Sequence, residues 1–338
     1  MKKSTIIIAE AGVNHNGDIN LAKKLIDIAA DAGADYVKFQ TFRTEKLVST
    51  IAKKADYQQD NTGSVSQFDM LKKLELSVAQ HYDLISYCEQ KNIRFLSTAF
   101  DLDSIDLLNS LGINLFKIPS GEITNLPYLK KIGSLSKDVI VSTGMCIMSE
   151  IEDAVNVLIK AGTLRERISI LHCTTDYPTG MNDVNLNAML SIKNQLDFPI
   201  GYSDHTLGIE VPIAAVAMGA VIIEKHFTLD KTLPGPDHKA SLEPAELKAM
   251  VNAIRNIEKA MGSGEKQPSE TEKKNRLAAR KSIHLVKKVE KNHIITEQDL
   301  IMKRPGDGIS PMLMEQVLGK KLISDFESEH KLEWGNMA

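Results

Sequence analysis

Short apolar, β-branched runs recur roughly every 25–30 residues along most of the chain, and nearly every run ends in polar residues. Runs this continuous are typical of parallel strands that helices cover from outside. Stretches of helical periodicity separate them, such as LAKKLIDIAADAG and ELKAMVNAIRNIEKAMG. In chain order the apolar runs and their polar ends read TIIIAEAG, YVKFQTF, RFLSTAF, LFKIPSGE, VIVSTGM, ISILHCTT, PIGYSDH and VIIEKHFT.

Eight strand-then-helix units predict an α/β fold, a (β/α)8 TIM barrel, in which the active site lies at the carboxyl ends of the strands. The helix in SEIEDAVNVLIKAG should begin with capping by Ser149 and end at Gly162. The longest irregular stretch, Arg43–Phe68, follows the second predicted strand, and a loop of that length usually forms a lid or a substrate wall.

The chain has 338 residues, whereas a barrel uses roughly 250. We therefore expect a barrel over residues 1–262, a polar interdomain linker over 263–281 and a small, turn-rich domain over 282–338. The last domain is too small for a comfortable core of its own, so it should dock against another surface.

The amino-acid composition argues against several classes of function. The net charge is -3 with 25% charged residues, so no basic field favours nucleic acid or an anionic membrane. Three cysteines make no CxxC pair and cannot close a disulfide framework, which indicates a reduced, cytoplasmic setting. No stretch approaches the 18 apolar residues of a membrane span, and the N-terminal apolar run is too short for a signal peptide.

Two histidines close neighbouring predicted strands, the seventh and the eighth. His205 and His226 can therefore converge on one ion, and a pair without thiolates suits a catalytic Mn2+ or Mg2+ better than structural zinc. The alternative is that one or both only make hydrogen bonds in the barrel mouth.

Two lysines, Lys38 and Lys117, interrupt apolar strands and must face the barrel mouth or be buried unpaired. With Ser120, Ser142 and Ser203 they could form a ring of donors for a phosphate or carboxylate. One lysine could instead be the nucleophile of a Schiff-base aldolase, or a structural residue at the rim.

Acidic residues stand at the same edge. Glu10 and Glu224 end the first and last strands, and Asp237 lies in the following loop, LPGPDHKAS. They are candidates for general bases or acceptors of sugar hydroxyls, with structural pairing to the lysines as the alternative. His15 could belong only to a tight turn, and Cys173 to the core.

The combination of motifs resembles a known family, the bacterial sialic acid (nonulosonate) synthases, from residue 5 to about residue 325. The resemblance implies a barrel with an antifreeze-like (SAF) domain, in a domain-swapped homodimer whose tails cover each other's active sites. It also implies condensation of phosphoenolpyruvate with an amino sugar and release of phosphate. The motifs are AEAGVNHNG, VKFQTF, STAFD, FKIPSGEITNLPYL, STGM, LHCTTDYP, GYSDHTLG, EKHFTLD, GPDHKASLEP and KRPGDGISP.

The same resemblance assigns residues. It implies that His205 and His226 bind the metal, usually Mn2+, with Mg2+ or Co2+ as alternatives, and that Arg304 reaches the N-acetyl group of the sugar in the partner's site. The phosphoenolpyruvate residues would be Lys38, Thr98, Lys117, Ser120, Ser142 and Ser203. Those around the sugar and the attacking water would be Glu10, Gln40, Tyr177, Glu224 and Asp237.

The identity of the sugar depends on fewer positions. Thr175 stands where certain N-acetylneuraminate synthases have Asn, and the blocks SGEITNLPYLKK and LHCTTDYP look especially like legionaminate synthases. We take N-acetylmannosamine, giving N-acetylneuraminate, as the first expectation. The alternative is 2,4-diacetamido-2,4,6-trideoxymannose, giving N,N'-diacetyllegionaminate. A Schiff-base aldolase and a non-enzymatic carbohydrate-binding protein are more distant hypotheses.

Overall fold

The structure is a computed structural model that describes residues 4–49, 52 and 66–338 of the chain. The chain divides into two compact units, Met1–Gly262 and Ser263–Ala338. Within the described residues no helix is both long and apolar enough to cross a membrane.

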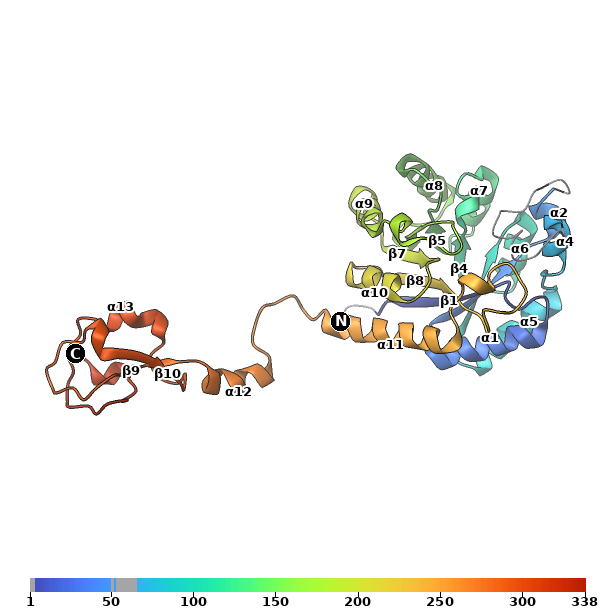
Figure 1. Ribbon diagram of the computed structural model, residues 1–338. Coiled ribbons are helices and arrows are strands. Elements are labelled where there is room, and N and C mark those ends of the chain that lie inside the picture. Colours follow the sequence, from blue (N-terminus) through green and yellow to red (C-terminus); the bar gives the residue numbers. More distant parts are fainter. Residues whose placement is uncertain (1–3, 50–51, 53–65) are drawn as a thin grey trace. The chain divides into compact units, whose positions relative to one another are not determined.

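The first unit is a closed barrel of eight parallel strands, paired in sequence order from β1 to β8 and back to β1 (Figure 1). This confirms the predicted fold class. The strands are β1 (Ile6–Gly12), β2 (Tyr36–Thr41), β3 (Arg94–Ala99), β4 (Leu115–Ile118), β5 (Asp138–Ser142), β6 (Ile168–Cys173), β7 (Ile200–Asp204) and β8 (Ile222–His226).

Helices surround the strands, as Figure 1 shows. The stretch Arg43–Phe68, expected to form a lid, lies partly outside the described residues, and its described ends carry the short helices α2 (Thr44–Leu47) and the start of α4 (Gln67–Lys72). The helices that follow the strands are α1 (Ile19–Ala32), α5 (Val78–Gln90), α6 (Leu102–Ser110), α7 (Leu126–Ser134), α8 (Met148–Ala161), α9 (Leu186–Leu196), α10 (Glu210–Ala217) and α11 (Pro244–Ala260).

The predicted start of α8 was wrong by a residue or two. The N-cap is Ile147, whose backbone N–H donates to the Glu150 carboxylate, so Ser149 already lies inside the first turn. A glutamate three residues into a helix can satisfy the first free amide without a hydroxyl at the cap. Gly162 follows the last helical residue, as predicted.

Side chains along each strand point alternately to the outside and to the inside of the barrel. Outward side chains such as Val37 and Phe39 join the large core beneath the helices. Inward side chains form a separate apolar plug inside the barrel. Gly201 belongs to this plug, because a Cβ atom there would lie 2.4 Å from the Ile222 carbonyl oxygen and 2.5 Å from Leu171 Cδ2. The buried plug residues are Ile8, Leu96, Ile140, Leu171 and Ile222.

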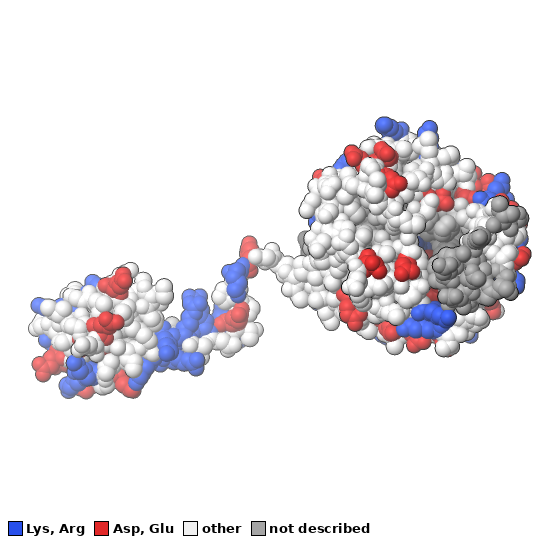
Figure 2. All heavy atoms as spheres, turned by 45° about the horizontal axis from the view of Figure 1, so that its top comes forward, with Lys and Arg blue, Asp and Glu red and all other residues white. Residues whose placement is uncertain are grey.

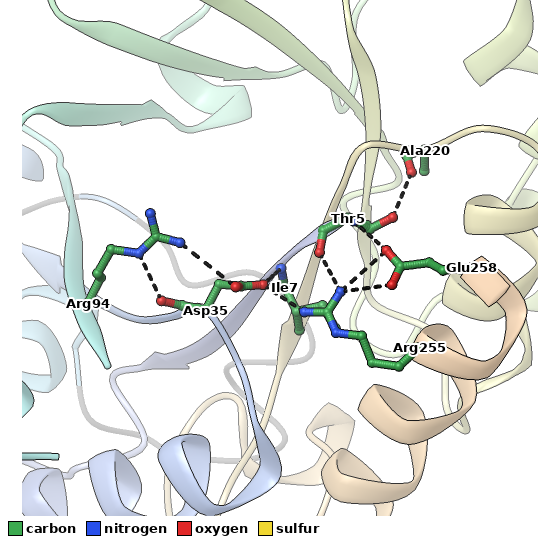
Figure 3. Close-up of polar contacts among 7 residues, drawn as sticks. All are labelled: Thr5, Ile7, Asp35, Arg94, Ala220, Arg255 and Glu258. Carbon is green, nitrogen blue, oxygen red and sulfur yellow. Dashed lines mark hydrogen bonds and ion pairs between the residues drawn. The ribbon is translucent and has the colours of Figure 1, made fainter. Parts of the chain in front are cut away.

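A polar network joins α11 to the amino-terminal end of the barrel (Figure 3). Arg255 donates to the Asp35 carboxylate at 2.9 Å and to the Thr5 carbonyl at 2.8 Å. Asp35 also accepts from the Ile7 backbone N–H at 2.8 Å, and Glu258 accepts from that of Thr5. The last helix is thereby fastened to the first strand, which helps to keep the cylinder closed.

The second unit contains α12 (Glu270–Ala279), an antiparallel pair of strands, β9 (Ser282–Leu285) and β10 (Leu300–Lys303), and α13 (Met314–Val317). Helix α12 lies within the predicted linker 263–281, so the linker is partly helical, although none of the residues of α12 is buried. Figure 2 shows basic side chains gathered along this segment. A small core holds the unit together: Ile283, Leu285, Val289, Ile295, Ile309, Val317, Leu322 and Leu332.

We predict that Arg255→Met lowers the free energy of unfolding by about 1.5–3 kcal/mol, because it removes charge-assisted hydrogen bonds that tie α11 to β1. Urea denaturation followed by circular dichroism measures the change. The control is Lys248→Met, on the exposed side of the same helix, which should stay within about 0.5 kcal/mol of wild type. Equal stability of the two variants would contradict a fastening role for Arg255.

Candidate active site

A polar layer lies above the apolar plug and lines a hollow of about 190 Å3 at the carboxyl ends of the strands. The structure brings most of the predicted site residues together here, and it adds Phe100, Pro119, Gly121, Met145 and Cys173. The predicted residues that line the hollow are Glu10, Lys38, Gln40, Thr98, Lys117, Ser120, Ser142, Thr175, Tyr177, Ser203, His205, Glu224 and His226.

The strand register places these side chains next to one another. Glu10 of β1 pairs with Lys38 of β2, Thr98 of β3 with Lys117 of β4, and Ser203 of β7 with Glu224 of β8. Successive residues of a strand point to opposite faces of the sheet. Each of these residues lies two positions beyond a plug residue on its own strand or pairs with a plug residue on the neighbouring strand, so its side chain also points into the barrel. Leu171 is an inward residue, so Cys173, two positions later, also faces the hollow. The same alternation could have identified Cys173 in the sequence.

A buried ion-pair network occupies the centre of the hollow. The Glu224 carboxylate lies 2.7 Å from Lys38 Nζ and accepts from Lys117 Nζ at 2.9 Å and from the Ser203 hydroxyl at 2.9 Å. Glu10 lies 3.5 Å from Lys38 Nζ and accepts from the Gln40 amide at 3.4 Å. Removing any one charge would leave the others buried without full compensation, which is costly.

The two glutamates differ in protonation. Burial raises the pKa of Glu10 to about 8, an effect that the nearby Lys38 only partly offsets. Burial alone would also raise the pKa of Glu224, but Lys117 and Lys38 hold it well below its ordinary value. At neutral pH the layer therefore holds a neutral carboxylic acid at Glu10 and a carboxylate at Glu224. Paired carboxyl groups with separated pKa values are typical of proton-transfer sites.

His205 and His226 lie side by side, with ring centroids 5.5 Å apart. His205 Nδ1 lies 2.5 Å from the Thr174 carbonyl, which can only accept, so Nδ1 carries the proton and Nε2 keeps its lone pair. Within the described residues, His226 Nδ1 is buried without a hydrogen-bond partner. Burial lowers the pKa of His205 to about 4 and that of His226 well below its ordinary value. Two neutral imidazoles side by side, one of them oriented by a hydrogen bond, are suited to binding a divalent cation.

A second ion pair lies on the outer side of the same two strands. Asp204 and Lys225, the residues just before the two histidines, are fully buried and pair with each other. Lys225 also donates to the Thr206 carbonyl. The carboxyl ends of β7 and β8 are thus joined on one face, and the adjacent histidines emerge side by side on the other. Among the described residues, no group of three or more His, Cys, Asp or Glu side chains converges as a metal site.

Asp237 lies outside this hollow, and Arg304 belongs to the second unit. Asp237 lines a neighbouring hollow of about 260 Å3 together with Gln40, Tyr177 and His226, and burial raises its pKa to about 6. Arg304 follows β10 in the second unit and is exposed. Its loop is held by Ser282, whose hydroxyl donates to the Pro305 carbonyl at 2.7 Å and accepts from the Gly308 N–H at 2.8 Å.

The loop after β1 has a structural role. Asn14 donates its amide to the Phe227 carbonyl at 2.8 Å and to the Ser241 hydroxyl at 2.9 Å, which ties this loop to the one after β8. His15 is fully buried, and its Nδ1 accepts from the Gly17 N–H, so it belongs to a tight turn. These contacts hold the segment that carries Asp237 beside the strand ends.

The chain is similar to known proteins over nearly its whole length. The sequence model of the NeuB family matches residues 25–266, and that of the SAF domain matches residues 280–329. The chain is 57% identical to an N,N'-diacetyllegionaminic acid synthase from Campylobacter jejuni, over 97% of this chain and 98% of that protein. It is 48% identical to a protein of the same name from Legionella pneumophila, over 97% and 93%.

A solved structure is also similar. The crystal structure of N-acetylneuraminic acid (sialic acid) synthetase from Leptospira borgpetersenii, in complex with citrate, has a TM-score of 0.71 and 38% sequence identity, over 81% of this chain and 90% of that one. The fold and the sequence thus point to the same group of proteins.

The raised pKa of Glu10 predicts a pH-dependent stability. Its folded pKa, about 8, exceeds the unfolded value of about 4.5, so its contribution is fully present below about pH 4.5 and is lost as the pH rises to about 8. Glu10→Gln cannot ionise and escapes this loss. Relative to wild type, the free energy of unfolding of the variant should therefore rise by at least about 1.4 kcal/mol between pH 5 and pH 8.5.

Chemical denaturation at the two pH values measures this difference. The matched control is Thr98→Val, a nearly isosteric change in the same buried layer without a titratable group, whose difference from wild type should be the same at both pH values. If the stability of Glu10→Gln relative to wild type were as independent of pH as that of Thr98→Val, Glu10 would be ionised in the folded protein at neutral pH.

Proposed function

The chain belongs to the NeuB family of phosphoenolpyruvate-dependent condensing synthases, and from this we propose that it is an N,N'-diacetyllegionaminic acid synthase. It condenses phosphoenolpyruvate with 2,4-diacetamido-2,4,6-trideoxymannose and releases phosphate. The observation that carries the choice of sugar is the 57% identity over nearly the whole chain. It favours the alternative that the sequence offered over our first expectation, N-acetylmannosamine. The three free cysteines accord with a reducing compartment, and we place the reaction in the cytoplasm.

Phosphoenolpyruvate is the anion that the two lysines would bind. With Glu10 neutral, Lys38 and Lys117 share a single carboxylate, Glu224. Burial lowers the pKa of Lys117, and an anion bound beside it would favour its charged form. Two hydroxyls, Thr98 Oγ1 and Ser142 Oγ, are buried without a hydrogen-bond partner among the described residues. Such unsatisfied donors are costly unless a ligand oxygen accepts from them. These features support a phosphate and carboxylate subsite in the strand layer.

His205 and His226 would hold the divalent cation, which we propose to be Mn2+. The fit rests on their neutral rings, the hydrogen bond that orients His205 and the unpaired nitrogen of His226. When bound, the cation would supply Lewis-acid polarisation of the sugar aldehyde.

We assign proton transfer to Glu10. In the reaction, C3 of phosphoenolpyruvate bonds to the aldehyde carbon, the aldehyde oxygen takes a proton, water adds to C2, and the C2–O bond to phosphate breaks. A neutral Glu10 can donate the proton to the aldehyde oxygen, and its carboxylate can then accept one from the attacking water. Glu224 is less suited to either step, because the lysines keep it ionised and weakly basic.

The sugar would bind farther out, beyond the strand ends. Thr175 and Tyr177 line the outer wall of the hollow, and Gln40 and Tyr177 also line the neighbouring hollow that contains Asp237. We propose that Arg304 completes this site in trans, in a domain-swapped homodimer. The exposed position of Arg304, and the hydrogen bonds through which Ser282 fixes its loop, support a role in contacting a ligand outside its own unit.

The assay that tests the function is phosphate release from phosphoenolpyruvate with each sugar. We expect rapid release with the 2,4-diacetamido-6-deoxy sugar and a large loss of kcat/KM with N-acetylmannosamine, because a site built for one set of polar groups rejects analogues that lack them. Preference for N-acetylmannosamine would overturn the proposed sugar. Inactivation by borohydride in the presence of substrate would instead indicate a Schiff-base aldolase.

The metal is tested in the same assay. Chelation should abolish release and Mn2+ should restore it, whereas His226→Ala should stay inactive and lose Mn2+ binding measured by electron paramagnetic resonance. Full activity after exhaustive removal of metal would contradict the role of the two histidines.

Sharing of sites between chains is tested by mixing His226→Ala with Arg304→Ala, each inactive or strongly impaired alone. A mixed dimer then contains one site with both defects and one site with neither. Random exchange makes half of the dimers mixed, so activity should recover towards a quarter of wild type. Absence of recovery, with subunit exchange demonstrated by mass spectrometry, would show that Arg304 does not act in trans.

A further inference from the structure

A second hollow, of about 530 Å3, lies beside the catalytic one. The two share three lining residues, Met145, Cys173 and Thr175. The rest of its wall comes from the loop after β5, the end of β6 and the first turns of α8 and α9. Thr174 lies on this wall, and its carbonyl is the partner of His205 Nδ1. The wall of the second hollow therefore includes the residue whose carbonyl orients His205.

The lining of the second hollow suits a neutral group with one apolar and one polar end. Met148 and Ile151 of α8 and Ile192 of α9 supply apolar surface, and Asn185 and Asn187 supply side-chain amides. The lining includes one charged residue, Asp183, and no lysine or arginine among the described residues. A phosphate or carboxylate would find no cation here. An acetamido group would find apolar contact for its methyl and hydrogen-bonding partners for its N–H and C=O.

Met145 forms the boundary between the two hollows. Its backbone is left-handed, with φ at 66°, a conformation that residues other than glycine rarely adopt, and the residue is 72% exposed. Only glycine fits at the preceding position, Gly144, because a Cβ atom there would lie 2.5 Å from Thr175 Cγ2. A strained, exposed methionine at a pocket boundary is suited to contact with a ligand, since its thioether adapts to apolar groups.

From these observations we infer that the second hollow is the subsite for the 4-acetamido group of the sugar, with Met145 as its apolar wall. The inference rests on the proposed function and specifies what distinguishes the diacetamido sugar from N-acetylmannosamine. The aldehyde carbon lies at the histidine pair, and the chain from C2 to C4 passes Thr175 and Met145. The acetamido group on C4 then enters between α8 and α9.

Filling the hollow tests the subsite. Ala188 lies in α9 and lines the second hollow but not the first. Ala188→Leu should raise KM for the diacetamido sugar by about tenfold and leave KM for phosphoenolpyruvate unchanged. Asn187→Ala, a truncation at an exposed position that should not impair folding, should raise the same KM by about two- to tenfold. The matched control is Asn194→Leu, on an exposed position of α9 outside the hollow.

The outcomes separate the subsite from the function. A rise confined to KM for the sugar, absent in Asn194→Leu, supports the subsite. Unchanged constants in both pocket variants, or equal damage to kcat and to both Michaelis constants in Asn187→Ala, would overturn it. Absence of phosphate release by wild type with the diacetamido sugar would contradict the proposed function itself, whereas normal use of that sugar by both pocket variants would contradict only the subsite.

Discussion

The Glu224 carboxylate, held between Lys38 and Lys117, is the interaction on which the rest of the active site depends. Three charges buried inside a barrel are stable only while each has its partner, so the network fixes the side chains of three strands at once. It also separates the roles of the two acids. Glu224 neutralises the lysines, and Glu10, left with a weaker share of their charge, keeps its proton at neutral pH.

The fold and most of the site could be predicted from the sequence, because both follow from the same short patterns. Lys38 and Lys117 interrupt apolar strands, and a buried lysine needs a charged partner, which both find in Glu224 inside the barrel mouth. Positions set by loop conformation could not be predicted. Met145 has a left-handed backbone, and Gly144 before it lies so close to Thr175 that a Cβ atom would not fit. That contact exists only after β5 and β6 are assembled.

The protonation states of the two glutamates could not be predicted from the sequence either. Glu10 and Glu224 occupy equivalent positions at the ends of the first and last strands, and nothing in their neighbours along the chain distinguishes them. The difference arises from the closed barrel, which places Glu224 within hydrogen-bonding distance of Ser203 on the neighbouring strand and of Lys117 on a strand across the interior. The start of α8 was likewise misplaced because Glu150 caps the backbone from inside the helix, where a cap is harder to recognise than Ser149 in front of it.

The apolar plug has a kinetic consequence. Ile8, Leu96, Ile140, Leu171 and Ile222 close the barrel below the polar layer, so the site is a cup that opens on the side of the loops. Whatever occupies the bottom of a cup must arrive before, and depart after, whatever covers it. In the proposed reaction the lysine subsite lies on the strands and the sugar subsite on the loops above them. The proposed arrangement would impose a compulsory order, with phosphoenolpyruvate arriving ahead of the sugar and phosphate leaving only after the nine-carbon product has moved aside.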